Sequence, residues 1–138
     1  MYLSHNNIKT IQGLDHLSSL EVLWICDNKI EVLENMDKLV NLRELWVAGN
    51  QIDAIKTSLD SLVSLTDLNI SGNKICTFKE VLNLNRLPNL KVLSFYDPHF
   101  GENPICNLCN YQTYVLYHLR NIKKLDTLAI SDDAKAFA

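Results

Sequence analysis

Two cysteines separated by two residues, Cys106 and Cys109, have the spacing most typical of site chemistry in this sequence. A C-x-x-C pair forms half of a tetrahedral zinc site or a redox pair. A zinc site would also need His99, His118 or Cys76, because the sequence contains no second C-x-x-C pair and no closely spaced histidine pair. We therefore predict no metal and no other cofactor. Cys106 and Cys109 remain the metal candidates, and we interpret both thiols as small buried apolar side chains.

Catalytic motifs are absent from the sequence. It contains no G-x-S-x-G nucleophile elbow, no Walker loop and no dinucleotide-binding glycine motif. The four histidines, which include His5 and His16, have no serine or carboxylate partner at a recurring spacing. Since no nucleophile or acid–base pair can be named, the sequence predicts a protein that is not an enzyme and has no small-molecule substrate.

The composition excludes several other classes of protein. The chain has 138 residues, of which 47% are hydrophobic, with 13 basic and 16 acidic side chains. This fits one folded domain over residues 1–138, and it lacks the basic excess expected of direct nucleic-acid binding. No long uncharged apolar run is present, so no membrane contact is expected. The unpatterned cysteines and the lack of a signal peptide favour a cytoplasmic location.

Leucine and asparagine are abundant, with 23 and 15 residues, and both recur at a fixed spacing. The pattern L-x-x-L-x-L-x-x-N-x-L is complete at residues 20–30, 42–52 and 65–75, partial at 1–8 and altered at 90–100. Its asparagine position falls at 6, 28, 50, 73 and 98, at intervals of 22, 22, 23 and 25 residues. A repeat of roughly 20–29 residues predicts stacked coils that each add one short strand to a parallel sheet.

Each coil should also contain an asparagine that stabilises its turn. A side-chain amide both donates and accepts, so it can bind backbone groups of its own coil and of the neighbouring coil. We expect such a ladder at Asn6, Asn28, Asn50 and Asn73. The fifth position is Pro98, and the ladder is expected to end there.

A helix is predicted beside the fourth coil. Thr77 and Glu80 have the spacing of a capping box, in which the Glu80 side chain reaches back to the N-cap Thr77. The helix should run from Phe78 to about Leu87, because Pro88 follows.

An end unit is predicted after the repeats. Tyr111, Val115 and Leu119 are four residues apart, which predicts an amphipathic helix, and residues 122–128 have the pattern of a last strand-like coil. A solenoid needs an atypical unit of this kind to cover the open end of its core.

The repeats and the end unit resemble leucine-rich repeat proteins of the 22-residue, protein-phosphatase-1-regulator type. The tyrosine, valine, leucine and Leu-Asp elements of that family's C-terminal cap match Tyr111, Val115, Leu119 and Leu125-Asp126. Arg120 stands where the family usually has proline, and Thr127 where it usually has glycine. Residues 97–111 resemble the segment at the same place in a second family, that of leucine-rich repeat-containing protein nine, whose members are large. We therefore interpret the chain as an array from a longer protein that begins within a repeat, with an exposed first coil.

The resemblance implies an α/β leucine-rich repeat solenoid. A curved parallel sheet would form its concave face and short helical segments its convex face, with a cap at the C-terminal end. The expected organisation is about five repeats at 1–97, a loop at 98–110, a cap at 111–130 and a tail at 131–138.

The side chains on the outer face of the strands are the candidates for binding. One column reads Tyr2, Trp24, Trp46, Asn69 and Ser94, and its neighbours include Glu44, Asp67 and Tyr96. An exposed aromatic stripe favours binding of a protein partner, as a non-catalytic scaffold. The alternative is that the rings only pack on one another and stiffen the sheet.

The resemblance also implies classes of partner. These are a phosphatase catalytic subunit or an axonemal assembly, with axonemal or nuclear locations beside the cytoplasmic one. A ribonucleoprotein scaffold is the alternative function, and a structural spacer within a larger protein is another.

Overall fold

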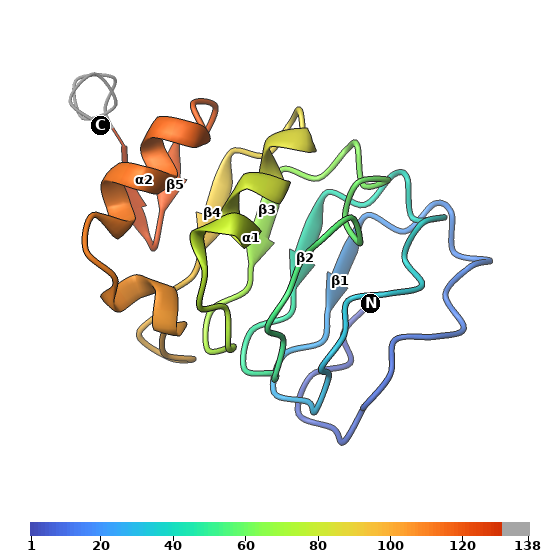
Figure 1. The fold of residues 1–138 in the computed structure, drawn as a ribbon. Helices are drawn as coiled ribbons and strands as arrows, with labels where there is room; N and C mark the ends of the chain where they lie inside the picture. The colour runs from blue at the N-terminus through green and yellow to red at the C-terminus, as the bar shows by residue number, and fades with distance from the viewer. Residues whose placement is uncertain (131–138) are drawn as a thin grey trace.

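The computed structural model describes residues 1–130 of the chain. Its six strands form one sheet in sequence order (Figure 1): β1 Val22–Trp24, β2 Glu44–Trp46, β3 Asp67–Asn69, β4 Val92–Ser94, β5 Lys124–Leu125 and β6 Leu128–Ala129. Strands β1 to β5 are parallel, and β6 pairs antiparallel with β5. Each coil stacks on the preceding one, which confirms the predicted leucine-rich repeat solenoid.

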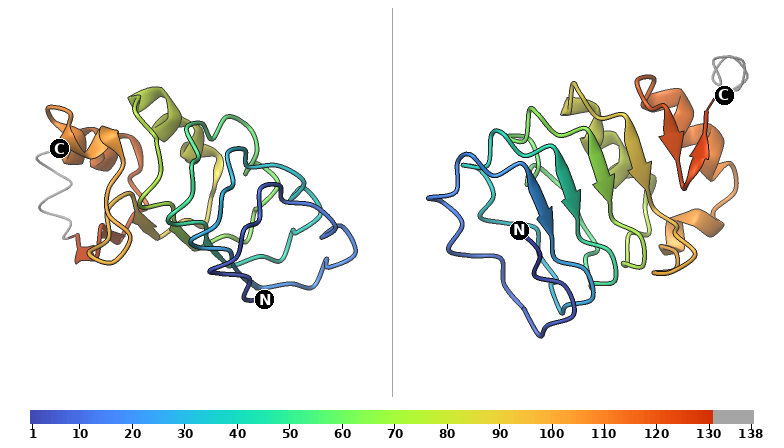
Figure 2. Two further views of the ribbon diagram at one scale, coloured as in Figure 1. Left: turned by 90° about the horizontal axis from the view of Figure 1, so that it is seen from below. Right: turned by 180° about the vertical axis from the view of Figure 1, so that it is seen from behind.

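The helical segments lie on the side opposite the strands (Figure 2). They are α1 Phe78–Leu82, the 3-10 helix η1 Asn83–Arg86, the 3-10 helix η2 Pro104–Asn107 and α2 Tyr111–His118. Seen from behind in Figure 2, the strands lie in front and the helices behind them, so the outer face of the sheet is open over the described chain. Within residues 1–130, no helix is long and apolar enough to cross a membrane.

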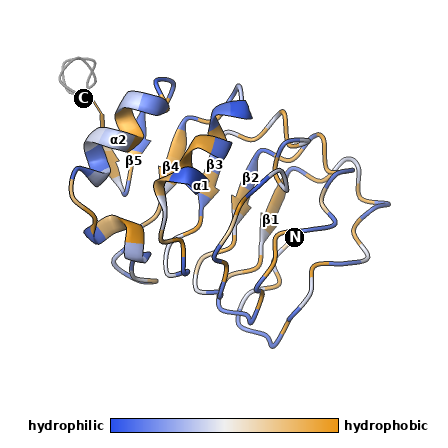
Figure 3. Ribbon diagram, viewed as in Figure 1, coloured by the Kyte–Doolittle hydropathy of each residue, from blue (hydrophilic) through white to orange (hydrophobic). Residues whose placement is uncertain are grey.

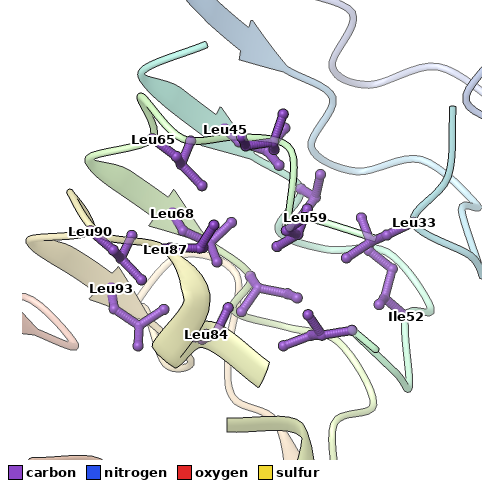
Figure 4. Packing of buried hydrophobic residues seen from close by; sticks show 14 of the residues in the cluster. Leu33, Leu45, Ile52, Leu59, Leu65, Leu68, Leu84, Leu87, Leu90 and Leu93 are labelled. Carbon is purple, nitrogen blue, oxygen red and sulfur yellow. The ribbon is translucent and has the colours of Figure 1, made fainter. Parts of the chain in front are cut away.

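The core lies between the sheet and these segments. The strand leucines Leu23, Leu45, Leu68, Leu93 and Leu125 are aligned by the strand register, and each is at most 2% exposed. Leucines and isoleucines of successive coils meet beneath them (Figure 4), and hydrophobic residues alternate with hydrophilic ones along each coil (Figure 3). A leucine side chain stabilises the folded state by about 1.5–3 kcal/mol when it is fully buried. Because each coil needs its neighbour to bury its leucines, the coils fold as a stack.

The asparagine ladder is present at three of its predicted positions. Asn28, Asn50 and Asn73 are 6–7% exposed, and each links its own coil to the preceding one. The Nδ2 of Asn50 donates to the Val47 carbonyl at 2.8 Å and to the Ile25 carbonyl at 3.0 Å, while its Oδ1 accepts from the Ile30 amide. Asn6 differs, because it is exposed and donates only to carbonyls of its own coil.

The prediction that the ladder ends at Pro98 is wrong. Asn103 is fully buried and occupies the next ladder position. Its Nδ2 donates to the carbonyls of Ile70 and Phe95, and its Oδ1 accepts from the Ile75 amide, all at 2.9 Å. Residues 98–102 are an insertion closed by two backbone hydrogen bonds between Asp97 and Gly101. The insertion interrupts the motif without ending it, so a search at fixed spacing misses Asn103.

The helix beside the fourth coil begins at Phe78, as predicted, but the capping box is wrong. Thr77 makes no side-chain cap hydrogen bond. Glu80 is 8% exposed, and its Oε2 accepts from the amides of Ile55 at 2.9 Å and Lys56 at 3.3 Å. Because Glu80 is on the buried side of the helix, its carboxylate meets the preceding coil and makes charge-assisted hydrogen bonds there.

The predicted end unit is confirmed. Val115 and Leu119 are buried, and the Tyr111 hydroxyl donates to Oδ2 of Asp126 at 2.6 Å. Oδ1 of Asp126 accepts from the amides of Phe95 at 2.8 Å and Tyr96 at 3.0 Å. Burial, followed by the negative charge of Asp126, raises the pKa of Tyr111, so its phenol remains a donor. This carboxylate therefore ties the cap to the end of β4.

We expect Thr127→Gly to raise the free energy of unfolding by roughly 0.5–1 kcal/mol. Asp126 and Thr127 join β5 to β6 with φ values of +51° and +71°. A β-branched residue is strained in this left-handed conformation, and glycine is not. Urea denaturation measures the change. Thr113→Gly is the control, because it lies within α2 and should be destabilising. A lower stability of Thr127→Gly than of the parent protein would contradict the prediction.

Candidate functional site

The outer face of the sheet carries the predicted aromatic column. Strand register places Trp24 beside Trp46, Trp46 beside Asn69 and Asn69 beside Ser94, and Tyr2 forms an isolated bridge to Trp24. The Trp24 and Trp46 rings stack with their centroids 4.2 Å apart and an interplanar angle of 9°. The Tyr2 ring meets Trp24 edge-on, with centroids 4.9 Å apart. These three residues form one continuous group, which we call the aromatic column.

The five residues of the predicted binding column differ in their exposure to water. Tyr2 is 69% exposed and the two tryptophans are half-buried, whereas Asn69 and Ser94 are 6% and 8% exposed. Oδ1 of Asn69 accepts hydrogen bonds from the hydroxyl and the amide of Ser71, which holds its side chain against the sheet. The accessible part of the predicted site is therefore its aromatic end, and Asn69 and Ser94 contribute little surface.

Neighbouring groups fix the orientation of the tryptophans. The Nε1 of Trp24 donates to Oε1 of Glu44 at 2.9 Å. Stacked rings stabilise one another by about 0.5–1.5 kcal/mol beyond their buried area. The rings do pack on one another, as the structural alternative predicts, and they also keep surface in contact with water.

A hollow of ≈ 230 Å³ lies next to the aromatic column. Trp46, the buried Asn69 and Ser94, Asp97 and Lys124 line it. Asp67, a predicted site residue, lines it as well. Lys124 was not predicted as a site residue. It pairs with Val92 in the strand register, so an alignment of the last coil with the preceding repeats would have placed it on the outer face. Asp97 is the last repeat position before the insertion, and the repeat alignment places it level with Asp27, Gly49 and Gly72.

The two carboxylates of this hollow are only partly hydrogen-bonded. Oδ1 of Asp67 accepts from the Thr66 hydroxyl at 2.9 Å, and Oδ1 of Asp97 accepts from the His99 amide at 2.7 Å. Neither Oδ2 atom has a hydrogen-bond partner in the part of the chain that the structure covers. Both carboxylates can thus accept hydrogen bonds from a ligand.

One other predicted neighbour and one unpredicted pair lie at the edges of this surface. Tyr96 is 41% exposed and lies beyond β4, near the cap. At the opposite end, Nδ1 of His5 lies 3.1 Å from Oδ2 of Asp27 on the surface. The expectation that no histidine has a carboxylate partner at a recurring spacing is wrong for His5, which lies one 22-residue repeat interval before Asp27 and meets it in the neighbouring coil.

The two metal candidates have different environments. Cys106 is half-buried and its thiol donates to the Phe95 carbonyl at 3.5 Å, whereas Cys109 is exposed. The interpretation of both thiols as buried is therefore wrong for Cys109. Across residues 1–130, no group of three or more His, Cys, Asp or Glu side chains could hold a metal ion.

Thiol reactivity should follow burial. Desolvation raises the pKa of Cys26 from 9.0 to about 11, whereas Cys76 and Cys109 are exposed. Because the thiolate is the nucleophile, we expect iodoacetamide at pH 8 to modify Cys76 and Cys109 at least about 100-fold faster than Cys26. Timed alkylation followed by peptide mass mapping measures the rates. In urea the four rates should converge, and rapid modification of Cys26 in the folded protein would refute the prediction.

Comparisons with known proteins agree with this architecture. A family model described as "Leucine-rich repeat" matches residues 1–137. The chain is similar to a chain of the SNF/U2A′ complex of Drosophila melanogaster, with 21% identity and a TM-score of 0.85 over 95% of this chain and 74% of that one. It is also similar to internalin C2 of Listeria monocytogenes, with 27% identity and a TM-score of 0.63 over 86% of this chain. A leucine-rich repeat protein of Leptospira interrogans gives 23% identity and a TM-score of 0.67 over 99% of this chain. The match covers 46% of the Listeria chain and 33% of the Leptospira chain.

Proposed function

The chain belongs to the leucine-rich repeat family, and from this premise we propose that it is a non-catalytic scaffold that binds a protein partner through the outer face of its sheet. The observation that carries the proposal is the aromatic column, which lies on a sheet face that no helix covers within the described residues. Tyrosine and tryptophan often dominate interface energies, because they release much apolar surface from water when a partner covers them.

The charges around the column indicate the chemistry of the partner. Glu44 lies beside Trp24, and Asp67 and Asp97 line the hollow next to Trp46. Electrostatic complementarity therefore favours an apolar peptide or helix that carries basic groups. The comparisons give no support to a phosphatase subunit or an axonemal assembly, so we define the partner by this chemistry alone.

Affinity capture from a lysate tests the proposal. Trp24→Ala combined with Trp46→Ala should weaken partner binding by at least about 30-fold, because one central aromatic residue contributes ~2 kcal/mol or more. Quantitative mass spectrometry identifies the captured partner, and calorimetry with the purified partner gives the affinity.

The matched control changes exposed apolar residues outside the strands. Val32 and Val63 are 55% and 49% exposed, and both lie in segments between strands. Their alanine variants should retain the partner. The proposal fails if the double tryptophan variant binds as tightly as the parent protein, or if the valine variants lose the partner equally.

A ribonucleoprotein scaffold is the second candidate function. It is favoured by the likeness to a chain of the SNF/U2A′ complex. Direct contact with RNA would make the affinity fall steeply with added salt, because phosphate contacts release counterions, whereas an apolar protein interface would respond weakly. A salt titration with and without ribonuclease distinguishes the two functions.

A further inference from the structure

We infer that the hollow beside Trp46 binds an arginine side chain of the partner protein. This inference rests on the proposed function for the location of the partner, and it adds the chemical group that the site selects. Its volume of ≈ 230 Å³ is below the roughly 300–1,000 Å³ typical of small-molecule sites, so it suits one side chain better than a metabolite.

Trp46 provides an aromatic surface for a cation. One face of its indole stacks on Trp24 from β1, and Trp46 lines the hollow on the side of β3. The face of an indole carries negative partial charge and attracts a cation placed over it. A planar guanidinium can lie flat on this face, which an ammonium group cannot do.

The carboxylates give the hollow its preference for positive charge. Asp67 and Asp97 line it, Glu44 pairs with Asp67 in the neighbouring strand, and Lys124 is the basic residue of the lining. Two acidic side chains against one basic side chain make an anion the less favoured ligand. The N–H donors of a guanidinium can bond to the Oδ2 atoms of Asp67 and Asp97, which have no hydrogen-bond partner within the described residues.

The insertion at residues 98–102 keeps Asp97 at the hollow. The Phe100 carbonyl lies against Gly72, whose φ is +64°, at the place where a side chain would begin. A glycine at this position therefore allows the insertion to approach the sheet. In this way the insertion, which two backbone hydrogen bonds between Asp97 and Gly101 close, lies close to the sheet beside the hollow.

The test uses two peptides in place of the unidentified partner. One is acetyl-Gly-Arg-Gly-amide, and the other contains citrulline, which is the neutral isostere of arginine. Each is titrated into the ¹⁵N-labelled protein while the indole N–H signals of both tryptophans are followed by NMR. The arginine peptide should produce a saturable shift at Trp46, with a smaller shift at Trp24, and should bind at least about 10-fold more tightly than the citrulline peptide.

Variants of the hollow complete the test. Asp67→Asn and Asp97→Asn should each weaken the arginine peptide by about 3-fold or more, while the remaining amide signals confirm that the protein is folded. The inference is overturned if citrulline binds as tightly as arginine, if no shift occurs at Trp46, or if both variants bind as the parent protein does.

This result is separable from that of the capture experiment. If the arginine peptide fails but the double tryptophan variant loses its captured partner, the arginine inference is wrong and the proposed function stands. If the peptide binds but the captured partner does not depend on the tryptophans, the hollow is real and the proposed function is wrong.

Discussion

Asn103→Ala should lower the free energy of unfolding by about 1–3 kcal/mol, because it leaves the buried Ile75 amide without a partner. The carbonyls of Ile70 and Phe95 also lose a donor, but Ile70 keeps Nδ2 of Asn73 and Phe95 keeps the backbone amide of residue 103. The loss should equal that of Asn73→Ala, which breaks the same kind of bonds one coil earlier. Urea denaturation followed by circular dichroism measures both losses.

Asn6→Ala is the matched control for this prediction. Asn6 has the same place in the repeat motif, but it is exposed and bonds only within its own coil. Its replacement should cost less than about 0.5 kcal/mol, as is usual for surface changes. If Asn103→Ala lowered the free energy of unfolding as little as Asn6→Ala does, the ladder would contribute no stability beyond Asn73.

Asp126→Ala should lower the free energy of unfolding by about 3 kcal/mol, since hydrogen bonds to a charged group are stronger than neutral ones. The carboxylate accepts from the amides of Phe95 and Tyr96 and from the Tyr111 hydroxyl. Its loss removes the side-chain hydrogen bonds that join α2 and the end of β4 to the cap, while the backbone pairing of β4 with β5 remains. Hydrogen exchange should show faster exchange at β4 and β5 than at β1 and β2, because the cap opens first.

Asp126→Asn separates the contribution of hydrogen bonding from that of side-chain removal. Its amide oxygen can still accept from Phe95 and Tyr96, and its NH₂ group can donate to the Tyr111 oxygen. We expect a loss of about 1 kcal/mol for this variant. Equal losses for Asp126→Asn and Asp126→Ala would show that hydrogen bonding at this carboxylate does not hold the cap.

Much of the fold can be predicted from the repeat. The strands around Leu23, Leu45 and Leu68 and their parallel pairing follow from one recurring pattern, because stacked coils repeat their backbone contacts at a nearly constant interval. The same register predicts that Trp24 and Trp46 are neighbours on the outer face. The matched cap residues Tyr111 and Asp126 likewise indicated the end unit.

Predictions from local spacing fail where a side chain forms hydrogen bonds with a distant part of the chain. Glu80 has the local spacing of a capping box, yet it bonds to Ile55, 25 residues earlier. Burial decides this choice, since the helix turns that carboxylate toward the preceding coil and away from Thr77. Local spacing cannot reveal which face of a short helix is covered.

The sequence by itself determined the repeat, the sheet register and the aromatic column, because each depends on a constant interval between residues. Only the tertiary structure showed that Asn103 continues the ladder and bonds to Ile70, 33 residues earlier in the chain. It also placed Asp97 beside Trp46 and Lys124 around one hollow. The physical reason is that an insertion changes the spacing along the chain, while the backbone groups that need partners stay at fixed positions in the stacked coils.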